Sequence, residues 1–235
     1  LEIKLNLVPA PPKIVGALGV HLNSIDEACK ATVIARTFMP GAIELLDDVV
    51  LACTKENIEL QKNRFFIQGD PKAVIIIEFA RNSKEEVVKL LDEVEAALKK
   101  NGFGYHFPRI FEGDINKVWA LRKAGLGLLA NVPGDPKAVA CIEDTAVDIH
   151  DQADFIAGFK EILKKYNKES VFYAHIGDGE IHLRPILDLK KSTDQKMFHD
   201  ITEDVAHLVK KFRGSLSGEH GDGRVTPIVG DQGFL

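Results

Sequence analysis

The chain has 235 residues, of which 45% are hydrophobic and 28% charged, and its formal net charge is −5. A chain of this kind is an ordinary globular protein, long enough to bury a full core as one large domain or two subdomains. The acidic balance and the lack of a Lys/Arg-rich run argue against nucleic acid as a partner. No apolar stretch approaches 18 residues and no signal-peptide pattern is present, so membrane contact is not indicated.

The three cysteines, Cys29, Cys53 and Cys141, show no CxxC spacing. We therefore expect reduced thiols in a cytoplasmic protein, with no zinc ribbon or iron–sulfur cluster in these residues. Because the sequence starts at Leu1 and stops at Leu235 without a terminating helix, we interpret it as a fragment of a longer polypeptide.

Hydrophobic periodicity predicts alternating strands and helices along the chain. Ser24 with Glu27 and Ser83 with Glu86 have the spacing of capping boxes and mark two helix starts. The expected elements are strands over 14–22, 72–80, 105–110, 138–147, 171–176, 181–187 and 214–218, and helices over 24–37, 83–100, 114–129, 149–166 and 193–212.

The hexapeptide Gly-Asp-Pro-Lys-Ala-Val occurs at 69–74 and again at 134–139. Each copy leads into a strand, a long helix and another strand, so an internal duplication explains the repeat about as well as the chance recurrence of a turn sequence does. The element order predicts an α+β fold made of two ferredoxin-like units, each an antiparallel sheet with helices packed on one face.

The most informative stretch is 173–182, Tyr-Ala-His-Ile-Gly-Asp-Gly-Glu-Ile-His. Asp178-Gly179 favours a two-residue type I′ turn between two runs with strand character. In that register His175 faces His182, with Cβ atoms roughly 4.5–5.5 Å apart, close enough for both imidazoles to hold one ion. The other predicted pairs are Ile176 with Ile181 and Tyr173 with Arg184, and the predicted core face carries Phe172, Ala174, Ile176, Ile181 and Leu183.

Two histidines are too few for a tight metal site, so a third ligand is expected in the motif at 217–223, Ser-Gly-Glu-His-Gly-Asp-Gly. With Leu216 in the core of an alternating strand, Glu219 emerges on the side of the histidines. His220 is then free to act as a base beside a Lewis-acid site with an open position. The alternative is a hairpin with solvent-facing histidines and a glycine-rich loop that bind no metal.

The remaining motifs point less directly to chemistry. The glycine-rich turns match neither a P-loop nor a dinucleotide-binding fingerprint. Arg122, on the helix with Trp119, is either a solvated side chain or a bidentate clamp for a substrate carboxylate. Ordinary surface or satisfied roles are assigned to His21, His106, His150, His199 and His207.

The chain resembles the C-terminal, substrate-side domain of FAD-linked oxidases of the vanillyl-alcohol-oxidase type. Four motifs carry the resemblance: the glycine-rich stretches 173–182 and 217–223, the segment Trp-Ala-Leu-Arg122, and the segment Gly-Ala-Ile-Glu-Leu-Leu-Asp47. That group includes glycolate oxidase subunits, D-lactate dehydrogenases and D-2-hydroxyglutarate dehydrogenase. The resemblance runs from about Leu1 to Gly223 and implies the duplicated ferredoxin-like fold. It also implies that residues 1–235 form this domain and that an FAD-binding domain precedes it, so the isolated fragment is expected to be inactive.

The resemblance further implies roles for single residues. His175, His182 and Glu219 correspond to the ligands of a divalent metal, with zinc suited best and manganese or iron as alternatives. His220 corresponds to the residue that takes the hydroxyl proton of a D-2-hydroxy acid of the lactate, glycolate or 2-hydroxyglutarate class while hydride passes to the flavin. Arg122 corresponds to the arginine that binds the substrate carboxylate.

The chain departs from the family pattern at one residue and in the length of one segment. Glu180 stands where the family usually has Asn, which places an acidic group near the substrate. The segment between Arg122 and Asp144 is longer than in the plain dehydrogenases, and within it Lys137 is only a candidate second clamp. The long segment between Arg122 and Asp144 is similar to that of large relatives that carry an additional iron–sulfur module. A second copy of the chain is one candidate partner, although the residues do not determine the oligomeric state.

Two other functions remain open from the residues alone. A His2Glu site could activate water in a metal-dependent hydrolase. The chain could also be a non-enzymatic metal- or ligand-binding module of ferredoxin-like fold.

Overall fold

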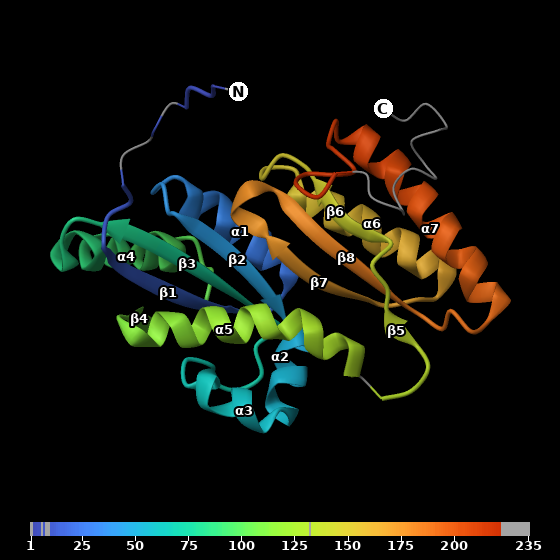
Figure 1. Cartoon of the computed structure of the whole chain (residues 1–235), viewed down its shortest axis with the longest axis horizontal. Coiled ribbons are helices and arrows are strands. Elements are labelled where there is room, and N and C mark those ends of the chain that lie inside the picture. Colours follow the sequence, from blue (N-terminus) through green and yellow to red (C-terminus); the bar gives the residue numbers. More distant parts are fainter. Residues whose placement is uncertain (1, 6, 8–9, 132, 222–235) are drawn as a thin grey trace.

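The computed structural model describes residues 2–5, 7, 10–131 and 133–221. An eight-stranded antiparallel sheet with the order β4-β1-β3-β2-β7-β8-β5, in which β6 also pairs with β8, forms its centre (Figure 1). The strands are β1 (Ile14–Leu22), β2 (Ala42–Asp47), β3 (Ala73–Arg81), β4 (Arg109–Phe111), β5 (Lys137–Ala138), β6 (Ile142–Ala146), β7 (Ser170–His175) and β8 (Glu180–Leu187). The helices are α1 (Ile25–Arg36), α2 (Asp48–Glu56), α3 (Ile58–Gln61), α4 (Lys84–Lys100), α5 (Gly113–Leu128), α6 (Gln152–Tyr166) and α7 (Ser192–Lys211).

The strand order confirms the predicted duplication. Strands β4-β1-β3-β2 with α1 and α4 form one ferredoxin-like unit, and β6, β8 and β7 with α6 and α7 repeat its plan. The two units join where β2 pairs with β7, at Leu45 with Ala174 and Leu46 with Tyr173. The hexapeptide repeat does not mark the duplication, because its first copy precedes β3 and its second precedes β5, a short additional strand on β8.

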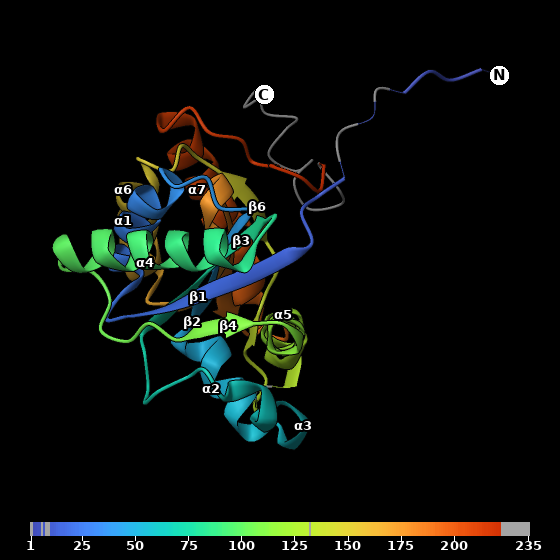
Figure 2. The ribbon, with the colours of Figure 1, turned by 90° about the vertical axis from the view of Figure 1, so that its left-hand side faces the viewer.

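The helices of the two units and the connecting helices pack on opposite faces of the sheet (Figure 2). Helices α1, α4, α6 and α7 cover one face, where they bury Leu91, Phe155 and Val205 with the sheet. Helices α2 and α5 lie on the other face and bury Val50 and Leu121. The candidate site lies on this second face, which carries fewer helices.

Local sequence signals explain the best-predicted elements. The Ser24 hydroxyl accepts a hydrogen bond from the Glu27 backbone N–H at 3.1 Å, and Ser83 with Glu86 forms the complete capping box. The predicted core face of the hairpin is confirmed, since Ala174, Ile181 and Leu183 are fully buried in the core on the side of α1 and α4.

Other expectations were wrong in extent. The strand expected over 138–147 is interrupted and forms β5 and β6. The strand expected over 105–110 is reduced to β4, with a single bridge between His106 and His21 before it. The segment 214–218 forms one bridge, Ser215 with Ala146, and no strand. Strand β2 and helix α2 were not predicted.

Asp47 connects the two units through its side chain. Its Oδ1 accepts from the Val50 N–H at 2.8 Å, which caps α2, and its Oδ2 accepts from the Phe172 N–H at 2.7 Å on β7. Burial raises the pKa of this carboxyl to about 7, although the backbone donors oppose the shift.

Among the described residues, no helix is both long and apolar enough to cross a membrane. Cys29 and Cys141 are buried and Cys53 is half-buried; all three thiols are free, and burial raises the pKa of Cys29 and Cys141 to about 12.

Candidate active site

The hairpin that carries the two predicted histidines has a different register from the predicted one. His175 lies opposite Glu180 and His182 lies opposite Tyr173, so the direct pairing of the histidines was wrong. The connection is a 3₁₀ turn over Ile176–Asp178 closed by Gly179, whose φ of 84° suits glycine. Because this turn is two residues longer than the type I′ turn, the pairing shifts by two residues and each side chain keeps its face.

The two histidines therefore still meet, as diagonal neighbours on one face. Their ring centroids are 5.6 Å apart, and the ring of Tyr173 stacks on that of His182 at 5.7 Å. A diagonal pair of this kind remains within reach of long or aromatic side chains.

His182 is fixed through its Nδ1 atom. Nδ1 bonds the backbone oxygen of Glu143 on β6 and lies 2.9 Å from a carboxylate oxygen of Glu180. Burial alone would lower the pKa of His182, but the Glu180 carboxylate and the Glu143 carbonyl raise it above its ordinary value. With Nδ1 engaged, Nε2 is the nitrogen available to the open side of the site.

His175 is fixed in the same way by Glu44 on β2. Its Nδ1 donates to Glu44 Oε1 at 2.9 Å, and this hydrogen bond raises the pKa of His175. Its Nε2 lies 3.4 Å from Glu219 Oε1. Both histidines thus use Nδ1 for a carboxylate or carbonyl partner, and their rings meet at 5.6 Å.

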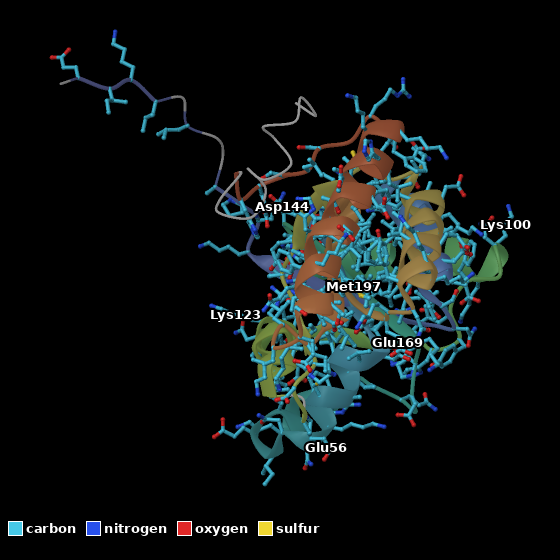
Figure 3. The ribbon with its side chains drawn as sticks, turned by 90° about the vertical axis from the view of Figure 1, so that its right-hand side faces the viewer. Glu56, Lys100, Lys123, Asp144, Glu169 and Met197 are labelled. Atoms are coloured by element: carbon cyan, nitrogen blue, oxygen red, sulfur yellow. The ribbon has the colours of Figure 1, made fainter. Side chains whose placement is uncertain are left out.

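The loop that carries Glu219 and His220 is held by Asp144 on β6. The Asp144 carboxylate accepts from the backbone N–H groups of Glu219 (2.9 Å) and His220 (2.7 Å) and from the Ser217 hydroxyl (2.8 Å). Burial alone would raise the pKa of Asp144, but these donors lower it below its ordinary value. Figure 3 shows Asp144 on the same side of the molecule as Lys123, which lines the site.

The loop brings His220 beside the first two histidines. Its ring stacks on that of His182 with centroids 5.7 Å apart, and its Nε2 lies 3.2 Å from Glu219 Oε1. The predicted position of Glu219 on the histidine side is therefore realised without the predicted strand. Asp222 and Gly223, the end of this motif, lie outside the described residues.

The cluster has the donor set of a divalent metal centre. His175, Glu180, His182 and Glu219 each offer one ligand atom, and these atoms all lie within 4.8 Å of one another. Two imidazoles with a carboxylate, their second nitrogens held by other partners, are ligands that suit zinc. The residues therefore fit the expected ion. The Asp144 carboxylate already accepts hydrogen bonds from the loop and acts as its anchor.

Arg122 reaches the cluster from α5. It is 9% exposed, forms an ion pair with Glu44 and lies 4.2 Å above the centre of the Tyr173 ring. Its Nη2 also donates to the Ala174 carbonyl oxygen at 3.3 Å. One cavity of about 430 Å³ connects these groups, lined by Trp119, Arg122, Lys123, Glu143, Tyr173, His175, His182, Glu219 and His220.

Two predicted substrate-binding residues are placed differently. Glu180 is 5% exposed and lies behind the histidines, where it contacts His182 Nδ1 and accepts from the His175 N–H at 3.3 Å. Lys137 of β5 pairs with Leu187 of β8, and directly paired residues share a face of the sheet. Leu187 is five positions from His182 along β8, so the two lie on opposite faces. Lys137 therefore lies on the face away from His182. The structure does not bring Lys137 to this cavity.

Sequence reasoning missed Glu44, Glu143 and Asp144, the acidic residues that fix the site. Glu143 also binds the guanidinium of Arg184 through both carboxylate oxygens, with Nε donating at 2.9 Å. The available signal was the presence of acidic residues inside two mostly apolar runs, 42–46 and 138–147, because a buried charge needs a partner.

Comparison with known protein families matches residues 11–226 to the family described as FAD linked oxidases, C-terminal domain. The chain belongs to this family. It is 31% identical to a D-2-hydroxyglutarate dehydrogenase of Haemophilus influenzae over 94% of its own length and 22% of that protein. It is 24% identical to the glycolate oxidase subunit GlcD of Bacillus subtilis, with coverage of 95% and 46%. The chain therefore spans less than half the length of these relatives.

Solved structures support the fold of this family member. A 4-ethylphenol oxidase from Gulosibacter chungangensis superposes with a TM-score of 0.60 at 13% identity, over 90% of this chain and 46% of that one. A p-cresol methylhydroxylase gives 0.59 at 13% identity, with coverage of 88% and 45%. At such low identity the likeness concerns the fold alone.

Proposed function

We propose that this chain is the substrate- and metal-binding part of an FAD-dependent dehydrogenase that oxidises a D-2-hydroxy acid to the 2-oxo acid. The observation that carries the proposal is the single cavity in which His175, His182, Glu219 and His220 meet Arg122. The family match and relatives named as D-2-hydroxyglutarate dehydrogenases support this reaction class. Lactate, glycolate and 2-hydroxyglutarate are the candidate substrates.

The proposed roles follow from the chemistry of each side chain. A divalent ion bound by His175, His182 and Glu219 would supply a Lewis acid that lowers the pKa of the substrate hydroxyl. Arg122 binds the substrate carboxylate by charge and hydrogen bonds. His220 accepts the hydroxyl proton, and the Glu219 carboxylate at 3.2 Å stabilises the resulting imidazolium.

FAD bound by a preceding domain would supply the hydride acceptor. In this proposal Glu180 supports His182 from behind, and Lys137 has no contact with the substrate. An iron–sulfur module outside this chain, a homo-oligomer and a cytoplasmic location remain predictions.

The test uses the full-length protein, with bound metal measured by elemental analysis and turnover by flavin reduction with D- and L-2-hydroxy acids. We expect His175→Ala and Glu219→Ala to lose metal and activity together, and His220→Ala to keep the metal and lose turnover. His199→Ala, an exposed histidine on α7, is the matched control and should change neither. Near-normal turnover in His220→Ala would rule out its role as the base, and full activity in verified metal-free enzyme would rule out the metal.

A further inference from the structure

A second cavity adjoins the candidate active site. Its volume is about 540 Å³, compared with about 430 Å³ for the active-site cavity. Trp119 lines both, so the two cavities meet at this side chain. The roles proposed for the active-site residues leave the second cavity without a function.

One face of α5 forms a wall of both cavities. Ile115, Asn116 and Trp119 line the second cavity, and Trp119, Arg122 and Lys123 line the active site. Spacings of three and four residues place these side chains on the same face of the helix. Helix α5 begins beside β4 and runs toward β5 (Figure 1). The second cavity therefore continues the active site along α5, toward the N-terminal end of the helix.

Charged groups of the second cavity already have partners within the protein. Glu78 accepts a hydrogen bond from the Trp119 indole N–H at 2.6 Å. The Lys84 ammonium lies 3.6 Å from the Glu112 carboxylate and 5.3 Å from the centre of the Phe111 ring. These contacts reduce what a charged ligand would gain by entering this space.

The rest of the lining is mainly apolar. It includes Ile14, Val15, Phe111, Ile115 and the Trp119 ring. Ile14 is 38% exposed, so a ligand that covers it removes apolar surface from water. A cavity of this volume with a mainly apolar lining is typical of sites for small organic groups.

The length of the combined cavity sets the size of a ligand that fills it. Arg122 is the residue proposed to hold the substrate carboxylate, and Ile115 precedes it by seven residues on α5. At a rise of 1.5 Å per residue, the two positions are about 10 Å apart along the helix. An extended chain of roughly eight carbons spans that distance, given C–C bonds of about 1.5 Å. Glycolate and lactate are too short to reach the second cavity.

We propose that the second cavity binds the side chain of the substrate, and that the substrate is a D-2-hydroxy acid with an unbranched apolar chain of roughly six to eight carbons in all. The carboxylate and hydroxyl lie at Arg122 and the proposed metal ligands, while the chain passes Trp119 and lies against Ile115 and Phe111. The oxidation of this acid rests on the proposed function, whereas binding of the apolar chain does not.

Steady-state kinetics of the full-length protein test the substrate class. The series runs from D-2-hydroxybutanoate to D-2-hydroxyoctanoate, with D-2-hydroxyglutarate as the charged comparison. We expect kcat/KM to rise about fourfold for each methylene that enters the cavity, or roughly 10²-fold over the series. Preference for D-2-hydroxyglutarate over every apolar member would overturn the proposal.

A matched pair of full-length variants tests the location of the chain. Asn116 is exposed and lines the second cavity, so Asn116→Trp should partly fill it. We expect the ratio of kcat/KM for the octanoate to that for the butanoate to fall at least about tenfold, because each lost methylene contact costs about fourfold. Lys117→Trp places the same side chain one residue on, where Lys117 lies 5.8 Å from the centre of the Phe65 ring, and should keep the ratio. Equal ratios in the two variants would refute the assigned position.

Binding of the corresponding 2-oxo acids separates the cavity from the reaction. Calorimetry on the full-length protein should show tighter binding of 2-oxooctanoate than of 2-oxobutanoate. The same preference in a protein that oxidises no hydroxy acid would uphold the apolar cavity and refute the proposed function. Turnover of hydroxy acids without any dependence on chain length would uphold the proposed function and overturn the role of the cavity.

Discussion

Glu44 accepts a hydrogen bond from Nδ1 of His175 at 2.9 Å across 131 residues of sequence. The same carboxylate forms an ion pair with Arg122 and is itself mostly buried, with 12% of its side chain exposed. One acidic residue on β2 thus orients a proposed metal ligand and the proposed substrate-binding arginine together. A substrate carboxylate that binds Arg122 must share the guanidinium with Glu44.

Replacement of Glu44 by Gln should weaken metal binding in the full-length protein. The amide can no longer fix the His175 tautomer by charge, and loss of such an outer partner typically costs about 10–100-fold in metal affinity. Zinc titration against a chelator measures the effect. Glu78→Gln is the control, since Glu78 bonds the Trp119 indole at 2.6 Å and has no bond to a histidine of the site. Equal zinc affinity in both variants would contradict the role of Glu44.

Arg122→Lys should raise KM for the hydroxy acid with a smaller effect on bound metal. Lysine keeps the charge but loses the planar fork and the contact with the Tyr173 ring, so we expect kcat/KM to fall about 10²-fold, or roughly 2.7 kcal/mol. Steady-state kinetics with measured metal content checks this. Lys123→Ala, at an exposed residue of the same cavity, should change kcat/KM only a few-fold; an equal loss there would indicate a general electrostatic effect instead.

Asp144→Asn should loosen the loop that presents Glu219 and His220. The Glu219 and His220 N–H groups both bond Oδ2, so an amide oxygen there can still accept from them, but it carries no charge, and each of these hydrogen bonds should weaken by about 1 kcal/mol. Faster hydrogen exchange of residues 217–220 should accompany a lower urea midpoint. Asp148→Asn, which affects a single exposed bond to the His150 N–H, should leave the loop unchanged.

Because the pKa of Asp144 is lowered, its stabilising effect is present above the ordinary carboxyl pKa and is lost as pH falls through the folded value.

Asp47 should make stability depend on pH in the opposite sense. Its folded pKa is raised to about 7, so its contribution is complete below its ordinary pKa and is lost as pH rises through about 7. Between these values the unfolding free energy of the wild type should fall relative to Asp47→Asn, by up to about 1.4 kcal/mol per pH unit. Urea unfolding from pH 5 to 8 measures this difference. A flat difference between the wild type and Asp47→Asn across this range would refute the raised pKa.

Local signals in the sequence determined much of the secondary structure and the side on which the site lies. The Ser83 capping box and the apolar run of β3 predicted α4 and β3 almost to the residue, because caps and periodicity act within a few positions. The shared face of His175 and His182 also followed from sequence, since a shift of two residues preserves the alternation of faces.

Tertiary structure decided the register and the partners that fix the site. The turn at Gly177 packs against Ile43 of β2, a contact between the two units that no turn propensity contains. Glu44 and Asp144 reach His175 and His220 over 131 and 76 residues, respectively, through strands that become neighbours only in the folded sheet. The sequence alone therefore pointed to the side chains that we propose as metal ligands, because their chemistry is intrinsic to residue type. The acidic residues that orient them follow from strand order, which depends on how the whole core packs.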